Sequence, residues 1–330
     1  MIKLLNNNRG VALLLTVLVI SLILVATLQF NTDMRSDLSA AANLRDSVRL
    51  GYTARSVFNL ARAVLSLDAR ESDFDSEHET WAELPALTDY ATFLFDGDKV
   101  KLEIADQSAR IQINALLYAE AEETRRKQRE LLMRLLQSEE FGLDEESAGQ
   151  IIEAILDWLD EDDEVTGFGG AENSYYHSLE TPYSCKNGPF EFIEELLFVR
   201  GVTRELFYGN EGRTGLKEYL TVYGTDGKIN INTAAPLVLM ALSDQIDAET
   251  ADNLIAYRGN EDNDLSDMNW YKSVPAFPGD VEIDAELITI SSAYFELQAE
   301  AFLGAMTRKI TGVIERRADK SSAIVSWKSE

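Results

Sequence analysis

The stretch MIKLLNNNRGVALLLTVLVISLILVATLQ, residues 1–29, decides how the rest of the chain is organised. A short polar head that carries Lys3 and Arg9 ends at Gly10, and an apolar run follows over residues 11–30. About 20 residues with a rise of about 1.5 Å each reach across a bilayer core of about 30 Å. Because positive charges favour the cytoplasmic side, we expect residues 11–30 to span a membrane once and the remaining chain to lie outside the cytoplasm.

The small residue Gly10 stands before the apolar run, whereas an ordinary secretory signal carries its small-residue cleavage site after that run. Cleavage after Gly10 would leave the membrane helix attached to the mature protein. This arrangement resembles the type IV prepilin leader of the pilin and pseudopilin class. The resemblance implies cleavage between Gly10 and Val11 by a prepilin peptidase, and methylation of the new amine on Val11. A plain signal anchor with an accidental glycine is the alternative for this stretch alone.

Leu15 departs from the pattern of that class, in which the fifth mature residue is usually a glutamate. The glutamate is thought to pair with the N-terminal amine of a neighbouring subunit. A subunit at the end of a filament lacks a neighbour on one side, and an unpaired buried carboxylate there would cost several kcal/mol. Leu15 therefore indicates a subunit at the tip of a filament.

The composition is strongly acidic, with 57 acidic and 30 basic residues and a net charge of −27. Such a surface repels nucleic acid and anionic lipid headgroups, and it suits divalent cations or basic partners. The single cysteine, Cys185, excludes an intrachain disulfide, and the sequence assigns it no role. With only His78 and His177 beside Cys185, a zinc site of the Cys and His type is not expected. No nucleophile-elbow sequence is present, and we expect no enzyme activity.

The hydrophobic spacing predicts one α-helix over residues 11–67, about 85 Å long, with Gly51 as a possible flex point. ATFLF (91–95) and KVKLEIA (99–105) predict a hairpin that turns at Asp96, Gly97 and Asp98. Residues 287–302, 307–316 and 322–327 read as three further strands, the first of them interrupted. We therefore expect an α+β, pilin-like fold in which a long N-terminal helix packs on an antiparallel sheet.

The middle of the chain, residues 115–272, is helical in texture and contains an internal repeat. IQIN (111–114) matches ININ (229–232), and LDEESAGQII (143–152) matches IDAETADNLI (246–255). In each copy an aspartate, Asp144 or Asp247, is placed to cap the second helix. The second copy resembles helix-hairpin-helix modules, which commonly bind DNA. Its hairpin SDQID (243–247) carries acids where phosphate binding needs glycines and basic residues, so no nucleic acid is expected.

These elements predict four parts in the chain. They are a prepilin leader (1–10), an N-terminal helix (11–67, with 11–30 transmembrane), a pilin-like β domain (68–114 and 273–330) and an inserted α-helical domain (115–272) with two helix-hairpin-helix-like repeats.

The segment DWLDEDDEVTGFGGAENSYYHSLETPY, residues 157–183, concentrates carboxylates in one loop. Asp160, Asp162 and Glu164 alternate along it, and Glu172 follows after flexible glycines, so these four residues are candidate ligands of a calcium ion. The spacing is not that of an EF-hand, because Val165 occupies the position of the turn glycine. A merely solvated acidic loop is the alternative.

A second acidic cluster, NEDND at residues 260–264, falls in the equivalent place after the second repeat. It offers Asp262 and Asp264 as further metal ligands, and a solvated loop is again the alternative.

Four stretches together resemble the minor pseudopilin K family of type II secretion: the leader with Leu15, DWLDEDDE followed by GGAENSYY, PFEFIEELLFVRGVT (189–203) and ININTAAPLVLMAL. The similarity covers nearly the whole chain. It implies a pilin-like helix and sheet with an inserted helical domain that binds calcium. It also implies a tip subunit that meets minor pseudopilins I and J, the major pseudopilin filament and secreted cargo, anchored in the inner membrane with its C-terminal domain in the periplasm.

Two other classes share some of these features. A minor pilin or tip adhesin of a type IV pilus would have the same leader. A membrane-anchored calcium-binding domain, or an anchored hydrolase, would use the acidic loop as its metal site; a hydrolase would also need an open coordination position and a pocket.

Overall fold

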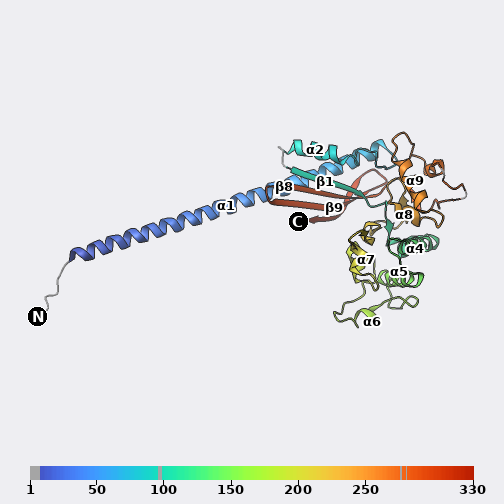
Figure 1. The fold of residues 1–330 in the computed structure, drawn as a ribbon, viewed down its shortest axis with the longest axis horizontal. Helices are drawn as coiled ribbons and strands as arrows, with labels where there is room; N and C mark the ends of the chain where they lie inside the picture. The colour runs from blue at the N-terminus through green and yellow to red at the C-terminus, as the bar shows by residue number, and fades with distance from the viewer. Residues whose placement is uncertain (1–7, 96–98, 276, 280) are drawn as a thin grey trace.

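A single α-helix, α1 (Asn8–Glu71), dominates the computed structural model, which describes residues 8–95, 99–275, 277–279 and 281–330. Its first half runs free of the head and its second half joins the head (Figure 1). The long helix predicted over residues 11–67 is confirmed, and it continues a turn further, to Glu71. Residues 1–7 of the predicted leader and the predicted turn at Asp96, Gly97 and Asp98 lie outside the described residues.

The second half of α1 packs on a four-stranded antiparallel sheet with the strand order β1-β8-β9-β10. The strands are β1 (Lys99–Asp106), β8 (Tyr294–Leu303), β9 (Met306–Arg316) and β10 (Ser322–Ser329). Leu50, Phe58 and Leu65 of α1 lie on its buried face and meet Leu297 of β8 and Ile310 of β9 in one apolar core. This core fixes the second half of α1 to the sheet.

The predicted strand ATFLF is wrong, because residues 91–95 belong mainly to a helix, α2 (Leu84–Leu94). Pro85 lies in the first turn, where a missing N–H costs nothing, and Leu87 and Ala91 are buried one turn apart. The predicted hairpin is wrong for the same reason. β1 instead pairs with β8, in a register that places Lys99 opposite Phe302.

The predicted interruption of residues 287–302 is real, and it separates two structural units. Its first part is β7 (Ile288–Thr289), which pairs in parallel with β6 (Ile229–Asn230) in the helical part of the molecule. Its second part, β8, lies in the main sheet between β1 and β9. The chain therefore crosses from one unit to the other between Thr289 and Tyr294.

A second, separate apolar core is built from residues between 111 and 288. Its helices are α3 (Ala115–Tyr118), α4 (Glu122–Gln137), α5 (Glu145–Leu159), α6 (Asn173–Tyr176), α7 (Arg204–Tyr208), α8 (Pro236–Ala241) and α9 (Ala248–Arg258). Three short 3-10 helices, η1 (Ile193–Phe198), η2 (Leu216–Glu218) and η3 (Trp270–Ser273), complete the helices. Short strands β2 (Ile111–Gln112) and β5 (Leu220–Thr221) pair in parallel, and β3 (Gly209–Asn210) and β4 (Arg213–Thr214) form a small hairpin.

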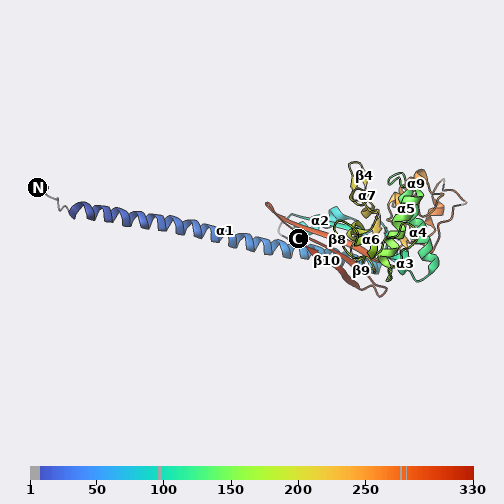
Figure 2. The ribbon, with the colours of Figure 1, turned by 90° about the horizontal axis from the view of Figure 1, so that it is seen from below.

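The elements built on this second core, short strands included, are called the helical domain. They gather beyond the end of the sheet that is remote from the N-terminus (Figures 1 and 2). Both predicted helix caps are present: Asp144 accepts a hydrogen bond from the Ser147 N–H at the start of α5, and Asp247 accepts one from the Thr250 N–H at the start of α9. That the two helix pairs arose by duplication remains a prediction.

Candidate metal centre

Three carboxylates meet where α5 ends and α6 begins. Asp157 lies in the last turn of α5, Asp160 is the residue after its end, and Glu172 precedes the first residue of α6. One oxygen from each lies within 4.8 Å of the others. Two ligands on opposite sides of a calcium ion are about 5 Å apart, since each calcium–oxygen distance is about 2.3 to 2.6 Å. The spacing therefore fits a single ion.

Four oxygens of this group have no hydrogen-bond partner within the described part of the chain. They are Oδ2 of Asp157, Oδ1 of Asp160 and both Oε atoms of Glu172, and all four are buried. A buried carboxylate without a partner is costly, and three together repel one another. A bound cation would remove both penalties, so the donor set fits a metal ion.

The pKa values of these three carboxylates are raised by the same burial and mutual repulsion. Burial raises the pKa of Asp160 to about 6, with a further contribution from the negative charges of Asp162 and Asp157. Burial, followed by the charges of Asp157 and Asp160, raises the pKa of Glu172 to about 7. Burial also raises the pKa of Asp157. All the candidate ligand atoms are oxygens, which is the chemistry that Ca²⁺ prefers.

The loop that follows α5 is folded back onto that helix, which holds the carboxylates in place. The N–H of Thr166 donates to Oδ1 of Asp157 (2.9 Å), and the N–H of Gly169 donates to Oε2 of Glu153 (2.6 Å). Gly170 passes so close that a Cβ there would lie 2.3 Å from Oδ2 of Asp157. Glycine is required at this position because any side chain would displace a carboxylate of the group.

Cys185 lies beside the group and is buried. Its thiol donates to the carbonyl oxygen of Asp157 (3.4 Å), and its backbone N–H donates to the side-chain oxygen of Asn173 (2.9 Å). Burial raises the pKa of the thiol to about 12. Cys185 therefore stays protonated and acts as a packing and hydrogen-bonding residue at the edge of the centre.

The structure brings together two of the four predicted ligands, Asp160 and Glu172. Asp162 and Glu164 are exposed, and Oδ1 of Asp162 accepts the N–H of Glu164 (2.8 Å), which closes a local turn. Asp157 is the candidate ligand that the sequence reasoning missed. The available signal was its spacing from Asp160, because residues three apart lie on one face of a helix end.

Asp262 and Asp264 belong to neither group of clustered carboxylates in the described residues. Both are exposed. Oδ1 of Asp264 accepts hydrogen bonds from the N–H (2.9 Å) and the hydroxyl (2.6 Å) of Ser266, which lowers the pKa of Asp264. The local turn thus satisfies this carboxylate without an ion.

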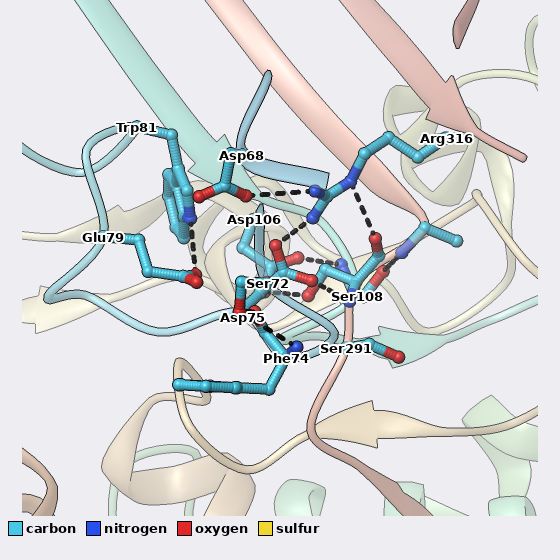
Figure 3. Close-up of polar contacts among 12 residues, drawn as sticks. Asp68, Ser72, Phe74, Asp75, Glu79, Trp81, Asp106, Ser108, Ser291 and Arg316 are labelled. Atoms are coloured by element: carbon cyan, nitrogen blue, oxygen red, sulfur yellow. Dashed lines mark hydrogen bonds and ion pairs between the residues drawn. The ribbon is translucent and has the colours of Figure 1, made fainter. Parts of the chain in front are cut away.

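A second group of carboxylates, Asp68, Asp75 and Glu79, also places oxygens within 4.8 Å of one another. Here the guanidinium of Arg316 bonds both Asp68 and Asp75 (Figure 3). A protein cation already neutralises part of this group, so we do not assign a metal to it.

The N-terminal candidates lie on α1. Gly10, Val11 and Leu15 are exposed, and of the described helices one is long and apolar enough to cross a membrane, between Gly10 and Glu71. A Cβ at Gly10 would meet nothing within 4 Å, so the fold places no demand on glycine there. Cleavage and methylation at Gly10 and Val11 remain predictions.

An apolar N-terminal helix that stands clear of the head along its first half and packs on an antiparallel sheet along its second half defines the pilin-like class of proteins. Within that class, residues 109–223 and 229–292 match two regions of the family described as Type II secretion system (T2SS), protein K. The chain belongs to this family, and it is a minor pseudopilin of a type II secretion system.

The chain is similar over most of its length to curated members of the family. It is 25% identical to the type II secretion system protein K of Pseudomonas aeruginosa, over 95% of this chain and 90% of the relative. It is 24% identical to the protein of the same description from Aeromonas hydrophila, over 95% of both chains. A chain in the crystal structure of the GspK–GspI–GspJ complex from enterotoxigenic Escherichia coli matches with a TM-score of 0.68 at 19% identity, covering 88% of this chain and 99% of that chain. This likeness shows the shared fold.

Proposed function

We propose that this chain is the minor pseudopilin that caps the tip of the type II secretion pseudopilus and supports the export of folded proteins. The observation that carries this proposal is the position of the helical domain at the end of the head remote from the N-terminus (Figure 1). Subunits of a pilin-like filament stack head over head along their N-terminal helices. A domain at the far end of the head would lie in the way of a further subunit, which supports a terminal position.

Leu15 supports the same position. A leucine there cannot form the ion pair with a neighbour's N-terminal amine that the pilin-class glutamate is thought to make. A tip subunit has no neighbour with which to form that pair. An unpaired carboxylate in an apolar filament core would destabilise the filament by several kcal/mol.

The related complex of known structure contains GspK together with GspI and GspJ, and we infer that minor pseudopilins I and J are the partners of this chain as well. The apolar residues 11–30 would hold the subunit in the inner membrane until assembly, with the head in the periplasm. The role is mechanical and involves no catalysis.

We further propose that the centre formed by Asp157, Asp160 and Glu172 binds calcium and thereby orders the loop between α5 and α6. When bound, the ion would supply the positive charge that buried Asp157 and Glu172 and half-buried Asp160 lack. The carboxylates then anchor the end of α5 and the start of α6 to one point.

Purification of the tagged, full-length chain from native membranes after mild cross-linking tests the tip assignment. Recovery of minor pseudopilins I and J in near-equal amounts, with little major pseudopilin, is the expected result. Recovery of type IV pilus subunits, or of major pseudopilin in large excess, would contradict it.

Mass spectrometry of the same sample tests the processing. We expect a chain that begins at methylated Val11. A chain that still begins at Met1, or that is cut beyond residue 30, would exclude assembly as a pseudopilin.

A further inference from the structure

A buried polar layer separates the two apolar cores of the head. The chain crosses between the cores after β1 and again before β8, and at these crossings Asp106, Ser108 and Ser292 are all buried. Asp75, in the loop after α1, is buried in the same layer, and its N–H donates to the carbonyl of Ile290 (2.7 Å). Polar groups with defined partners therefore join the two units here, beside the stacked rings of Tyr223 and Tyr294 (5.9 Å between ring centroids).

Arg316, the last residue of β9, reaches into this layer from one side and directs its guanidinium at Asp68 and Asp75 (Figure 3). Its Nη1 donates to Oδ2 of Asp68 at the end of α1 (3.1 Å), its Nη2 bonds Oδ1 of Asp75, and its Nε donates to the carbonyl of Ser292 (3.3 Å). The guanidinium also lies over the ring of Phe295, 4.5 Å from the ring centroid. The Arg316 side chain thus joins α1, the loop that follows α1 and the segment before β8 to the sheet.

The same layer reaches into the helical domain through Asn230 of β6. The Nδ2 of Asn230 donates to Oδ2 of Asp106 (3.3 Å), to the hydroxyl of Ser292 (2.8 Å) and to the carbonyl of Asp75 (3.1 Å). The N–H of Ser292 donates to Oδ2 of Asp75 (2.6 Å), and its hydroxyl donates to Oδ2 of Asp106 (2.5 Å). We call these six residues, Asp68, Asp75, Asp106, Asn230, Ser292 and Arg316, the junction network.

The junction network holds more negative than positive charge. The ionisable groups that face it are Asp68 and Glu71 from α1, Asp75 and Glu79 from the loop after α1, Asp106 from β1 and Arg316 from β9. Burial raises the pKa of Asp75 to about 7 and that of Asp68 to about 6, although Arg316 acts in the opposite direction, and burial raises the pKa of Asp106. When all of these carboxylates ionise, one guanidinium cannot balance them.

Water can reach the junction network through a cavity of about 590 Å³ that Asp75, Ser292 and Arg316 line. The charged residues on its wall are Asp73, Asp226, Lys228, Arg317 and Lys320. The cavity lies along the crossing between the two units, so solvent protons can exchange with the network. Its open volume also lets the two units move apart.

We propose that the junction network is a pH-responsive lock that holds the helical domain in one orientation on the sheet at mildly acidic pH and releases it as the pH rises. The network binds protons more tightly when it is closed than when its carboxylates are solvated. The stabilisation of the closed form is complete below a pH of about 4 and is lost as the pH rises to about 7. Each carboxylate that ionises raises the ratio of open to closed molecules by up to about tenfold per pH unit in that window.

Double electron–electron resonance on the full-length chain in detergent tests the lock. Spin labels at Lys99→Cys on β1 and Glu249→Cys on α9 report the distance between the sheet and the helical domain, and both positions are exposed. The native Cys185 is buried and does not compete for the label. We expect one narrow distance distribution at a pH of about 5.5, and a second, broader population that grows severalfold by a pH of about 8.

Two variants and a control identify the groups involved. Asp68→Asn removes a charge, keeps an oxygen for Arg316 and turns an amide towards Glu79, so it is expected to suppress the open population at the higher pH. Arg316→Gln removes the cation and is expected to increase that population. Arg317 lines the same cavity but lies outside the network, so the Arg317→Gln variant should behave as the wild type. The proposal is overturned if the wild-type distribution does not change with pH, or if Asp68→Asn leaves its pH dependence unaltered. Neither result bears on partner binding, so the lock can fail while the tip assignment stands.

Discussion

Replacing Glu172 by glutamine should make the protein more stable without calcium and less stable with it. The side chain of Glu172 is buried and both of its oxygens lack partners in the described part of the chain. Its pKa rises from 4.5 to about 7, which corresponds to about 3 kcal/mol at 1.36 kcal/mol per unit. The neighbouring loop residues 161–164 are exposed, and screening by solvent there reduces this to about 1 to 2 kcal/mol.

Without calcium at a pH of about 8, Glu172→Gln removes this cost, and the unfolding free energy should rise by about 1 to 2 kcal/mol. For a unit of this size that raises the melting temperature by about 2 to 8 °C. Calcium at about 100 times its Kd stabilises the native protein by about 2.7 kcal/mol. The variant has lost one of the three proposed carboxylate ligands and should gain far less, so the order of the two melting temperatures should reverse.

Thermal unfolding of the full-length chain in detergent, followed by circular dichroism with either chelator or calcium, measures both effects. Asp162→Asn is the matched control, because Asp162 is exposed, lies in the same loop and has its carboxylate outside the group of three. It should respond to calcium as the native protein does. A Glu172→Gln protein that is less stable in chelator, or that calcium stabilises as much as it does the native protein, would refute the reasoning.

Three further outcomes are expected. In chelator, the unfolding free energy should fall as the pH rises from about 4 to about 7, because native Asp160 and Glu172 have raised pKa values and bind protons more tightly than the unfolded chain. Calcium should reverse this slope, and urea unfolding across the pH range measures both slopes. Asp144→Ala removes the cap of α5 and should cost about 1 kcal/mol in the same assay, with no change in m-value. Phe58→Ala empties a fully buried site that packs edge-to-face on Trp327 (4.8 Å between ring centroids) and should cost about 3 to 5 kcal/mol; a cost below about 1 kcal/mol would mean that α1 is not held by this core.

Short-range patterns in the sequence were sufficient for the elements whose stability is local. The apolar run and the helical spacing after it predicted α1, and the caps Asp144 and Asp247 lie where their sequence spacing placed them. Strands β9 and β10 were also located within a few residues, because they are rich in β-branched and aromatic residues and are separated by a short turn.

Residues 91–95 show where such patterns fail. Aromatic and β-branched side chains favour a strand there, but Pro85 starts a helix and the burial of Leu87 and Ala91 completes it. An isolated segment of this length has similar preferences for either state, and contact with β1 and α1 decides between them.

The candidate metal centre shows the same limit. The sequence identified the acidic loop, and two of the four named ligands, Asp160 and Glu172, do meet. Asp162 and Glu164 point elsewhere, because the chain turns sharply after α5, and Asp157 takes part because the last turn of α5 faces that turn. Spacing along a loop does not state which carboxylates converge when the loop folds back.

The sequence by itself determined the long apolar N-terminal helix, the pilin-like class and the acidic loop, since each follows from residues close together in the chain. Tertiary structure alone decided which carboxylates share a site and how the two units of the head are joined. Arg316 meets Asp68 and Asp75 across 248 and 241 positions of sequence, and no local pattern signals such a contact. The free energy of a buried charge depends on the partners that folding brings to it, and those partners are specified by the packing of whole elements.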